Sequence, residues 1–263
     1  MLEDKPVESI LVDRALAYGD GLFATMRVLH GRILWLAQHL ARLSDGAERL
    51  GFTLTFSDDI RAQLIHLAQQ PSGCIKLHVS RGIGGRGYQA SAHPNPIIRM
   101  SFHPLPEHYD AWQANGIRLS TSRVRLGRQP LLAGIKHLNR LEQVLIKQEQ
   151  LPAGVDDYLV FDDQEHLIET SIGNIFLMIN GKVCCPSHGH AGVAGVARSQ
   201  VMLALLNMGF ALETRPIRRA ELQLAEHVFT TNSLFGIVDI IQIDQLNFCR
   251  FEATQRLRQQ ILC

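Results

Sequence analysis

A lysine can form a Schiff base with a carbonyl compound, and this chain has five lysines. Lys136 differs from the others because it follows the apolar stretch LLAGI and directly precedes a predicted helix. The positive end of a helix dipole and partial burial both lower the pKa of an amine, which Schiff-base chemistry requires. From position alone, Lys136 is either a catalytic amine or a structural lysine. The other four are expected to be solvated: Lys5, Lys76, Lys147 and Lys182.

Three further segments carry polar groups at positions where strands end or helices begin. Residues 169–176 place the carboxylate of Glu169 at the end of one predicted strand and a Gly-Asn connection before the next, although an ordinary strand connection with a solvated glutamate gives the same pattern. Residues 192–198 (GVAGVAR) lead into a predicted helix, and the first N–H groups of a helix can bind an anion. Residues 230–233 (TTNS) follow another strand.

Two motifs are poor matches to the sites they resemble. The run GIGGRG (82–87) lacks the following helix and the lysine of a nucleotide-binding loop, so a flexible loop on the substrate side is expected. The run CCPSHGH (184–190) has adjacent cysteines rather than the two-to-four-residue spacing of a zinc site. We therefore expect no metal and assign no catalytic role to the histidines.

The composition indicates a folded protein with a small-molecule partner. Apolar residues make up 46% of the 263 residues and charged residues 19%, which excludes a disordered or fibrous chain. The formal net charge of +1 gives no reason to expect nucleic acid or an anionic membrane as partner. Of the 26 basic residues 21 are arginine; this bias suits a substrate with several anionic groups, and genome composition produces it as well.

The cysteines and the N-terminus indicate a cytoplasmic protein. Five cysteines at irregular spacing do not suggest a disulfide framework. The first 13 residues are acidic and lack the apolar stretch of a signal peptide, and no run approaches the length of a membrane span.

The elements that must position these residues alternate between strands and helices in both halves of the chain. This pattern predicts an α+β fold of two domains, 1–115 and 116–263, with the cofactor lysine in the second and a cleft between them. In the first domain we expect strands at 8–13, 22–28, 33–35, 74–81 and 97–103, with helices at 36–50, 57–70 and 106–116. In the second we expect strands at 117–124, 158–161, 166–169, 174–180, 183–185, 211–215, 227–232 and 237–241, with helices at 137–149, 197–208 and the C-terminus.

The run from Glu169 to Phe176 and the run Gly195-Val196-Ala197-Arg198 resemble the signature of the fold-type IV pyridoxal-phosphate enzymes. This family includes branched-chain and D-amino-acid aminotransferases and aminodeoxychorismate lyases. The chain departs from the family pattern after the hairpin, where Cys185 takes the place of the usual threonine. The resemblance extends over essentially the whole chain, and three segments look like those of the lyases: residues 13–23 (DRALAYGDGLF), 80–88 (SRGIGGRGY) and 123–143. Within them, the runs GIKHLNRLEQ and GGRGY favour a lyase over an aminotransferase.

The resemblance implies pyridoxal 5'-phosphate as cofactor and a role for each matching residue. Lys136 would form the Schiff base and shuttle protons, and Glu169 would pair with the pyridine nitrogen. Arg42, Ser233 and the backbone amides of Val196 and Ala197 would bind the phosphate. Thr25 would lie beside the cofactor, and the candidates for the substrate carboxylates are Arg27, Arg86 and Tyr88.

The resemblance also implies the reaction. The expected activity is conversion of 4-amino-4-deoxychorismate to 4-aminobenzoate and pyruvate, a step of folate synthesis, by a homodimer. An aminotransferase of the same fold, acting on D-amino or branched-chain amino acids, is the alternative within the enzymes. A non-catalytic binding protein that kept the fold is the alternative from another class, and retention of both Lys136 and Glu169 argues against it.

Overall fold

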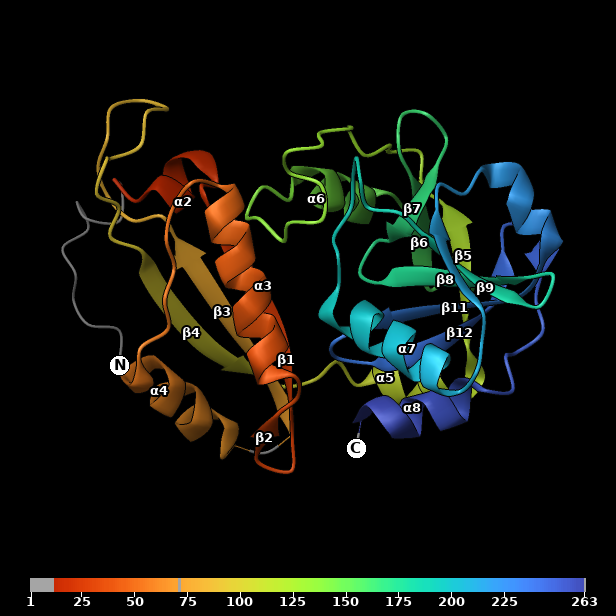
Figure 1. Ribbon diagram of the computed structural model, residues 1–263. Helices are drawn as coiled ribbons and strands as arrows, with labels where there is room; N and C mark the ends of the chain where they lie inside the picture. The colour runs from red at the N-terminus through yellow and green to blue at the C-terminus, as the bar shows by residue number, and fades with distance from the viewer. Residues whose placement is uncertain (1–11, 71, 263) are drawn as a thin grey trace. The chain divides into compact units, whose positions relative to one another are not determined.

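The computed structural model describes residues 12–70 and 72–262, which form two compact units. Unit 1 contains the chain up to Leu105 together with Ile135–Arg140, and unit 2 contains the remainder. Both units combine strands with helices, which confirms the predicted α+β class (Figure 1). The strand expected at 8–13 falls almost entirely outside the described residues.

The start of unit 2 differs from the predicted boundary between residues 115 and 116. Unit 2 begins at Pro106, because helix α5 (His108–Asn115) belongs to it. Tyr109 and Trp112 of α5 pack against the apolar core of unit 2, so the helix is held there by burial of its aromatic side chains.

The lysine segment also lies in a different unit from the one predicted. Ile135 is 3% exposed and belongs to the apolar core of unit 1. The following residues pair with the first long strand of that unit, where His137 lies opposite Leu22. Lys136 is therefore part of unit 1, whereas the sequence pattern placed it in the C-terminal domain.

Unit 1 is built on an antiparallel sheet with the strand order β2-β1-β3-β4. Alternate residues of β1 from Leu22 to Val28 are buried against helix α3, whose Leu40 and Leu43 face the same core. Figure 1 shows α3 lying along this sheet. The elements of unit 1 are α2 (Arg14–Tyr18), β1 (Gly21–Leu29), β2 (Arg32–Ile33), α3 (Leu36–Arg49), α4 (Asp58–Ala68), β3 (Gly73–Ser80) and β4 (Ile97–His103).

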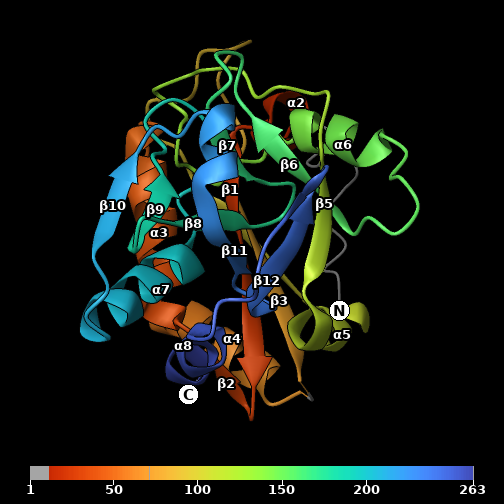
Figure 2. The same cartoon turned by 90° about the vertical axis from the view of Figure 1, so that its right-hand side faces the viewer.

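Unit 2 contains a larger sheet, part of which closes on itself. Strand β7 pairs with β6 on one side and with β8 on the other, so the path β8-β11-β12-β5-β6-β7 returns to β8. Closure removes the free sheet edges along this path. Figure 2 shows β11, β12 and β5 side by side. The strands are β5 (Ile117–Thr121), β6 (Asp157–Phe161), β7 (Leu167–Thr170), β8 (Asn174–Ile179), β9 (Lys182–Pro186), β10 (Leu212–Arg215), β11 (Ala225–Asn232), β12 (Gly236–Ile243) and β13 (Leu246–Asn247).

The helices of unit 2 cover its sheet and begin next to strand ends. Helix α7 packs against β11, and α8 packs against both β12 and α7. The helix predicted at 137–149 is shorter than expected, because residues 135–138 are extended beside β1. No helix in the described part of the chain is both long and apolar enough to cross a bilayer. The remaining helices of unit 2 are α6 (Leu141–Gln148), α7 (Val196–Asn207), the short 3-10 helix η1 (Arg219–Leu224) and α8 (Thr254–Leu262).

Gly21 allows the close approach of three segments of unit 1, and we predict that Gly21→Ala destabilises the protein. A Cβ atom there would lie 2.2 Å from the carbonyl oxygen of Val79 and 2.8 Å from Cδ1 of Leu138. We expect a loss of about 1–3 kcal/mol in the free energy of unfolding, measured by urea denaturation. Gly189→Ala is the matched control, because no atom lies within 4 Å of the added carbon. Equal unfolding midpoints for the two variants would contradict the prediction.

Candidate functional site

The backbone around Lys136 is held beside β1 by two hydrogen bonds. The N–H of Phe23 donates to the carbonyl oxygen of Lys136 at 3.0 Å, and the N–H of Leu138 donates to that of Gly21 at 2.9 Å. The Nζ of Lys136 lies 4.5 Å from the centroid of the Phe23 ring, a distance suited to a cation–π contact. Strand β1 thus sets both the backbone and the amine of Lys136.

Arg140 supports the same segment and was not identified from the sequence. Its Nε donates to the carbonyl oxygen of His137 at 2.8 Å, and its Nη2 donates to that of Ile135 at 3.1 Å. The guanidinium therefore holds the peptide groups on either side of Lys136. The arginine of the run KHLNR was visible in the sequence, but only the extended backbone brings it back onto these carbonyls.

The helix-dipole argument for Lys136 does not hold in the structure. Helix α6 begins at Leu141, five residues after the lysine, and the field of a helix dipole falls off within the first turn. The charges near Lys136 are instead those of neighbouring side chains.

Positive charge is concentrated around Lys136 in unit 1. Burial, followed by the charge of Arg140, lowers the pKa of Arg42 to about 10. Burial lowers the pKa of His137 to about 4, with smaller contributions from Arg140 and Lys136. Burial also holds the pKa of His39 well below its ordinary value, and Arg42 and Lys136 act in the same direction. Both histidines are therefore neutral at pH 7, and the cluster suits an anionic ligand.

The buried ring of His39 is a second feature of this cluster that suits a polar ligand. The residue lies on α3 one turn before Arg42 and is fully buried. Within the described part of the chain, neither of its ring nitrogens has a hydrogen-bond partner. Buried polar atoms are normally hydrogen-bonded, so an unsatisfied pair requires an explanation.

The other predicted residues of unit 1 lie on β1 and on the loop after β3. Thr25 and Arg27 share a face of β1 with Phe23, because strand residues two apart point the same way. Arg86 and Tyr88 lie on the loop of residues 82–90, and both side chains are exposed. The structure thus brings Thr25 onto the same strand face as the ring that Lys136 contacts.

In unit 2, Glu169 is a buried carboxylate at the end of β7. It is 7% exposed, and its Oε2 accepts a hydrogen bond of 3.1 Å from the backbone N–H of Val193. Across the sheet it lies opposite Asn174. The expectation of a merely solvated glutamate is therefore excluded by its burial.

Gly195 allows the side chain of Asn174 to approach the start of α7, where the residues predicted to bind phosphate lie. It occupies the N-cap position, and no side chain caps the helix. A Cβ atom on Gly195 would lie 2.2 Å from Oδ1 of Asn174. The first-turn N–H groups of a helix, which include those of Val196 and Ala197, have no acceptor within the helix and can receive an anion.

Asn174 and His188 connect these elements and were not predicted as site residues. The amide of Asn174 donates to the carbonyl oxygen of Val193 at 2.8 Å and lies 3.2 Å from Nε2 of His188. Burial, then the charge of Arg198, lowers the pKa of His188 to about 4, so the ring is neutral. The signal available in the sequence was the Gly-Asn pair and the histidine of CCPSHGH.

Two other sequence expectations concern unit 2. Ser233 follows β11 in the connection to β12, and Thr231 of β11 lies opposite Asn174 across the sheet. Cys185, which replaces the family's threonine, accepts a hydrogen bond of 3.0 Å from Nε of Arg198. Burial raises the pKa of its thiol, so at pH 7 a neutral sulfur takes the position of the hydroxyl.

Comparison with known proteins places these residues in a family. Residues 21–243 match the family model described as Amino-transferase class IV. The aminodeoxychorismate lyase of Vibrio harveyi is 35% identical over 94% of this chain and 93% of that protein. The D-alanine aminotransferase of Bacillus licheniformis is 26% identical over 88% of this chain and 82% of that protein. The crystal structure of 4-amino-4-deoxychorismate lyase from Pseudomonas aeruginosa has a TM-score of 0.91 and 38% identity, covering 99% of this chain and 95% of that one.

We predict that His188 makes the stability of the protein depend on pH between about 6.5 and 4. The folded state keeps the ring neutral down to about pH 4, whereas the unfolded state takes up a proton near pH 6.5. The unfolded state therefore binds more protons in this window, and stability falls as the pH falls. The contribution of this group is about 3 kcal/mol over the window.

His188→Gln should flatten the curve of unfolding free energy against pH, measured by urea denaturation from pH 7 to pH 4. His190→Gln is the control, because the side chain of His190 is exposed and should leave the curve unchanged. An identical slope for wild type and His188→Gln would contradict the prediction.

Proposed function

The chain belongs to the class IV aminotransferase family, and on this premise we propose that it is a pyridoxal-phosphate-dependent lyase that converts 4-amino-4-deoxychorismate to 4-aminobenzoate and pyruvate. The observation that carries the proposal is the likeness to two lyases of this substrate over nearly the whole chain. We also propose that the enzyme is a cytoplasmic homodimer that acts in folate synthesis.

The residues present fit pyridoxal phosphate. The cluster of Arg42, Arg140 and Lys136 with the unsatisfied ring of His39 suits a group that carries phosphate and other polar atoms. In unit 2, the N-terminus of α7 has no side-chain cap, and its first N–H groups suit the same kind of anion.

Each predicted residue then has a task toward the cofactor. Lys136 would hold it covalently through Nζ, and Glu169 would hold its pyridine nitrogen in the protonated form. When bound, pyridoxal phosphate withdraws electrons from the carbon that bears the substrate amine. Arg42, Ser233 and the amides of Val196 and Ala197 would bind its phosphate.

Lys136 would also move protons during the reaction. Its Nζ, released when the substrate amine takes its place, would take the proton from the amine-bearing carbon of the substrate ring, and the electron pair left by that proton would lead to expulsion of enolpyruvate from the neighbouring carbon. The ring becomes aromatic in that step, which supplies a strong driving force. The contact with Phe23 and the hydrogen bonds from Arg140 to the neighbouring carbonyl groups keep the amine in one place for this transfer.

The remaining predicted residues would act on the substrate. The hydroxyl of Thr25 would assist proton delivery to the departing enolpyruvate, since Thr25 shares a strand face with Phe23. Arg27, Arg86 and Tyr88 would bind the carboxylates of the ring and of the enolpyruvyl arm, because guanidinium groups suit carboxylates.

Aminotransferase activity toward D-amino or branched-chain amino acids is the less favoured reading. The same Lys136 and Glu169 would serve it, so cofactor binding does not separate the two activities. The products do, because an aminotransferase needs a keto acid as second substrate and releases no 4-aminobenzoate.

We predict that the purified protein forms 4-aminobenzoate and pyruvate in equal amounts from 4-amino-4-deoxychorismate without added keto acid. Lys136→Ala should lower the rate at least about a thousandfold, because both the covalent link and the proton carrier are lost. The measurement is fluorescence of 4-aminobenzoate with a coupled assay for pyruvate.

Lys182→Ala is the control, because Lys182 is exposed at the start of β9 and its substitution should leave the rate unchanged. Borohydride reduction should fix the cofactor to the protein, and mass spectrometry should then find it on the peptide that contains Lys136. Amino transfer that depends on a keto acid, with no 4-aminobenzoate formed, would overturn the proposal.

Glu169→Gln should retain the cofactor but slow turnover by about 10- to 100-fold, since a neutral amide does not stabilise a protonated ring nitrogen. The measurement is kcat together with the visible absorbance of the bound cofactor. Glu165→Gln removes a carboxylate from the turn between β6 and β7, where it is about half exposed and pairs with Arg125, and should leave kcat unchanged. Normal turnover of Glu169→Gln would assign the glutamate a structural role.

A further inference from the structure

We propose that Arg14 is a positioning residue, which anchors the glycine-rich loop of residues 82–90 and thereby presents Arg86 and Tyr88 to the substrate. The inference rests on the proposed function, which assigns these two side chains to the substrate carboxylates. Arg14 belongs to the segment DRALAYGDGLF, and the cofactor and proton-transfer tasks leave this arginine without a role.

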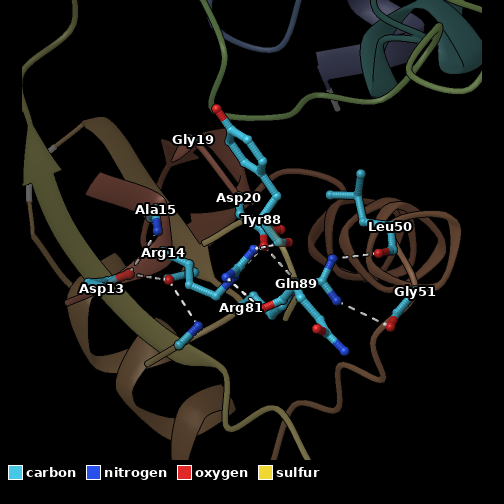
Figure 3. Close-up of polar contacts among 12 residues, drawn as sticks. Asp13, Arg14, Ala15, Gly19, Asp20, Leu50, Gly51, Arg81, Tyr88 and Gln89 are labelled. Atoms are coloured by element: carbon cyan, nitrogen blue, oxygen red, sulfur yellow. Dashed lines mark hydrogen bonds and ion pairs between the residues drawn. The ribbon is translucent and has the colours of Figure 1, made fainter. Parts of the chain in front are cut away.

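The guanidinium of Arg14 binds three consecutive carbonyl groups of the loop. Its Nη1 donates to the carbonyl oxygens of Gly87 and Gln89 at 3.2 and 3.4 Å, and its Nη2 donates to that of Tyr88 at 3.0 Å (Figure 3). The side chain is only 7% exposed. These bonds are therefore partly buried, and the loss of a partner for a buried guanidinium is costly.

The loop needs such an anchor because its own sequence favours many conformations. Gly82, Gly84, Gly85 and Gly87 all have positive φ angles, between +58° and +112°, which glycine adopts readily. The tip of the loop contains a short turn, in which Arg86 and Gln89 exchange backbone hydrogen bonds of 3.1 and 3.2 Å. A glycine-rich segment loses much entropy on ordering, and the bonds from Arg14 offset that cost.

Asp20 fixes the orientation of the Arg14 guanidinium. Its Oδ2 accepts a hydrogen bond of 2.8 Å from Nε of Arg14 and another of 2.8 Å from Nε of Arg81. With Nε bound to the carboxylate, the planar guanidinium directs its two terminal nitrogens at the loop. Lysine has no such fork and so does not reproduce this arrangement.

The base of the loop is tied to the same segment. The N–H of Arg14 donates to the carbonyl oxygen of Gly82 at 3.1 Å, and Asp13 accepts a hydrogen bond from the hydroxyl of Ser80. Asp13 also caps helix α2 through the N–H of Ala15 at 2.9 Å. Hydrogen bonds therefore connect the start of the helix, the base of the loop and its tip.

The anchored backbone presents the functional side chains outward. Tyr88 donates no side-chain bond to the network and is 89% exposed, while its carbonyl group faces Arg14. Figure 3 shows its ring extending away from the guanidinium. The ring lies 5.4 Å from that of Tyr18, which in turn lies 5.0 Å from the Arg14 guanidinium carbon. Arg14 thus sets the direction of Tyr88 through both backbone and ring contacts.

The test compares Arg14→Lys with Arg81→Lys in the full-length protein loaded with pyridoxal phosphate. Arg81 is the matched control, because it binds the same oxygen of Asp20 at the same distance and is 11% exposed. Its other nitrogens bind the carbonyl groups of Leu50 and Gly51 at the end of α3 rather than the loop. Both variants keep the positive charge.

Two readouts are measured for each variant. The first is hydrogen–deuterium exchange of the amides of residues 82–90 by mass spectrometry, and the second is KM and kcat for 4-amino-4-deoxychorismate. Arg14→Lys should raise the exchange rate of the loop and KM by about tenfold each, with kcat and cofactor affinity changed less than about threefold. Arg81→Lys should lower the melting temperature without moving either the loop exchange or KM.

Arg14→Gln is made in parallel, so that the test does not depend on the folding of the lysine variant. The glutamine amide can still donate to one carbonyl group. Unchanged loop exchange in both Arg14 variants, or equal changes in the Arg14 and Arg81 variants, would overturn the proposal. The exchange measurement needs no substrate. A wild-type protein that forms no 4-aminobenzoate would therefore refute the proposed function, while faster loop exchange in Arg14→Lys would still support the anchoring role.

Discussion

The pairing of residues 135–138 with strand β1 is the constraint on which the chemistry of unit 1 depends. It places the amine of Lys136 over the ring of Phe23 and brings it onto the strand that carries Thr25. Arg140 binds the flanking carbonyl groups from the same segment, so the lysine is held on both sides by hydrogen bonds. If Lys136 transfers protons as proposed, this fixed placement favours the transfer, because it holds the amine in one geometry.

The same pairing brings several positively charged side chains of unit 1 near one another. Arg42, Arg140 and Lys136 lie close enough to lower the pKa of the neighbouring groups, and the protein keeps His39 and His137 neutral beside them. In unit 2, helix α7 begins at Val196 without a side-chain cap. Uncapped N–H groups at a helix start and arginine side chains are both groups that favour anions.

The two acidic residues of the segment 13–20 show a different use of charge. Asp13 and Asp20 are buried or nearly so, and each binds an arginine and a neighbouring loop or strand. Their contribution is organisation of the glycine-rich loop rather than chemistry. The glycines allow the backbone of that loop to adopt positive φ angles, and the hydrogen bonds of the arginine network hold it in one conformation.

Local sequence patterns were sufficient to predict most of the strands and helices. The strand expected at 22–28 and the helices expected at 36–50 and 57–70 correspond to β1, α3 and α4, because such elements depend on local periodicity. The family signature around Glu169 and Gly195 was equally visible.

The positions of these residues in the fold depend on contacts between segments that are distant in the sequence. The sequence around Lys136 favoured a helix beginning at residue 137, but pairing with β1 keeps residues 135–138 extended and moves the lysine into unit 1. Likewise, no role of its own was predicted for Arg14. Its partners lie more than 70 positions along the chain, and bonds between residues so distant in sequence leave no local pattern that reveals them.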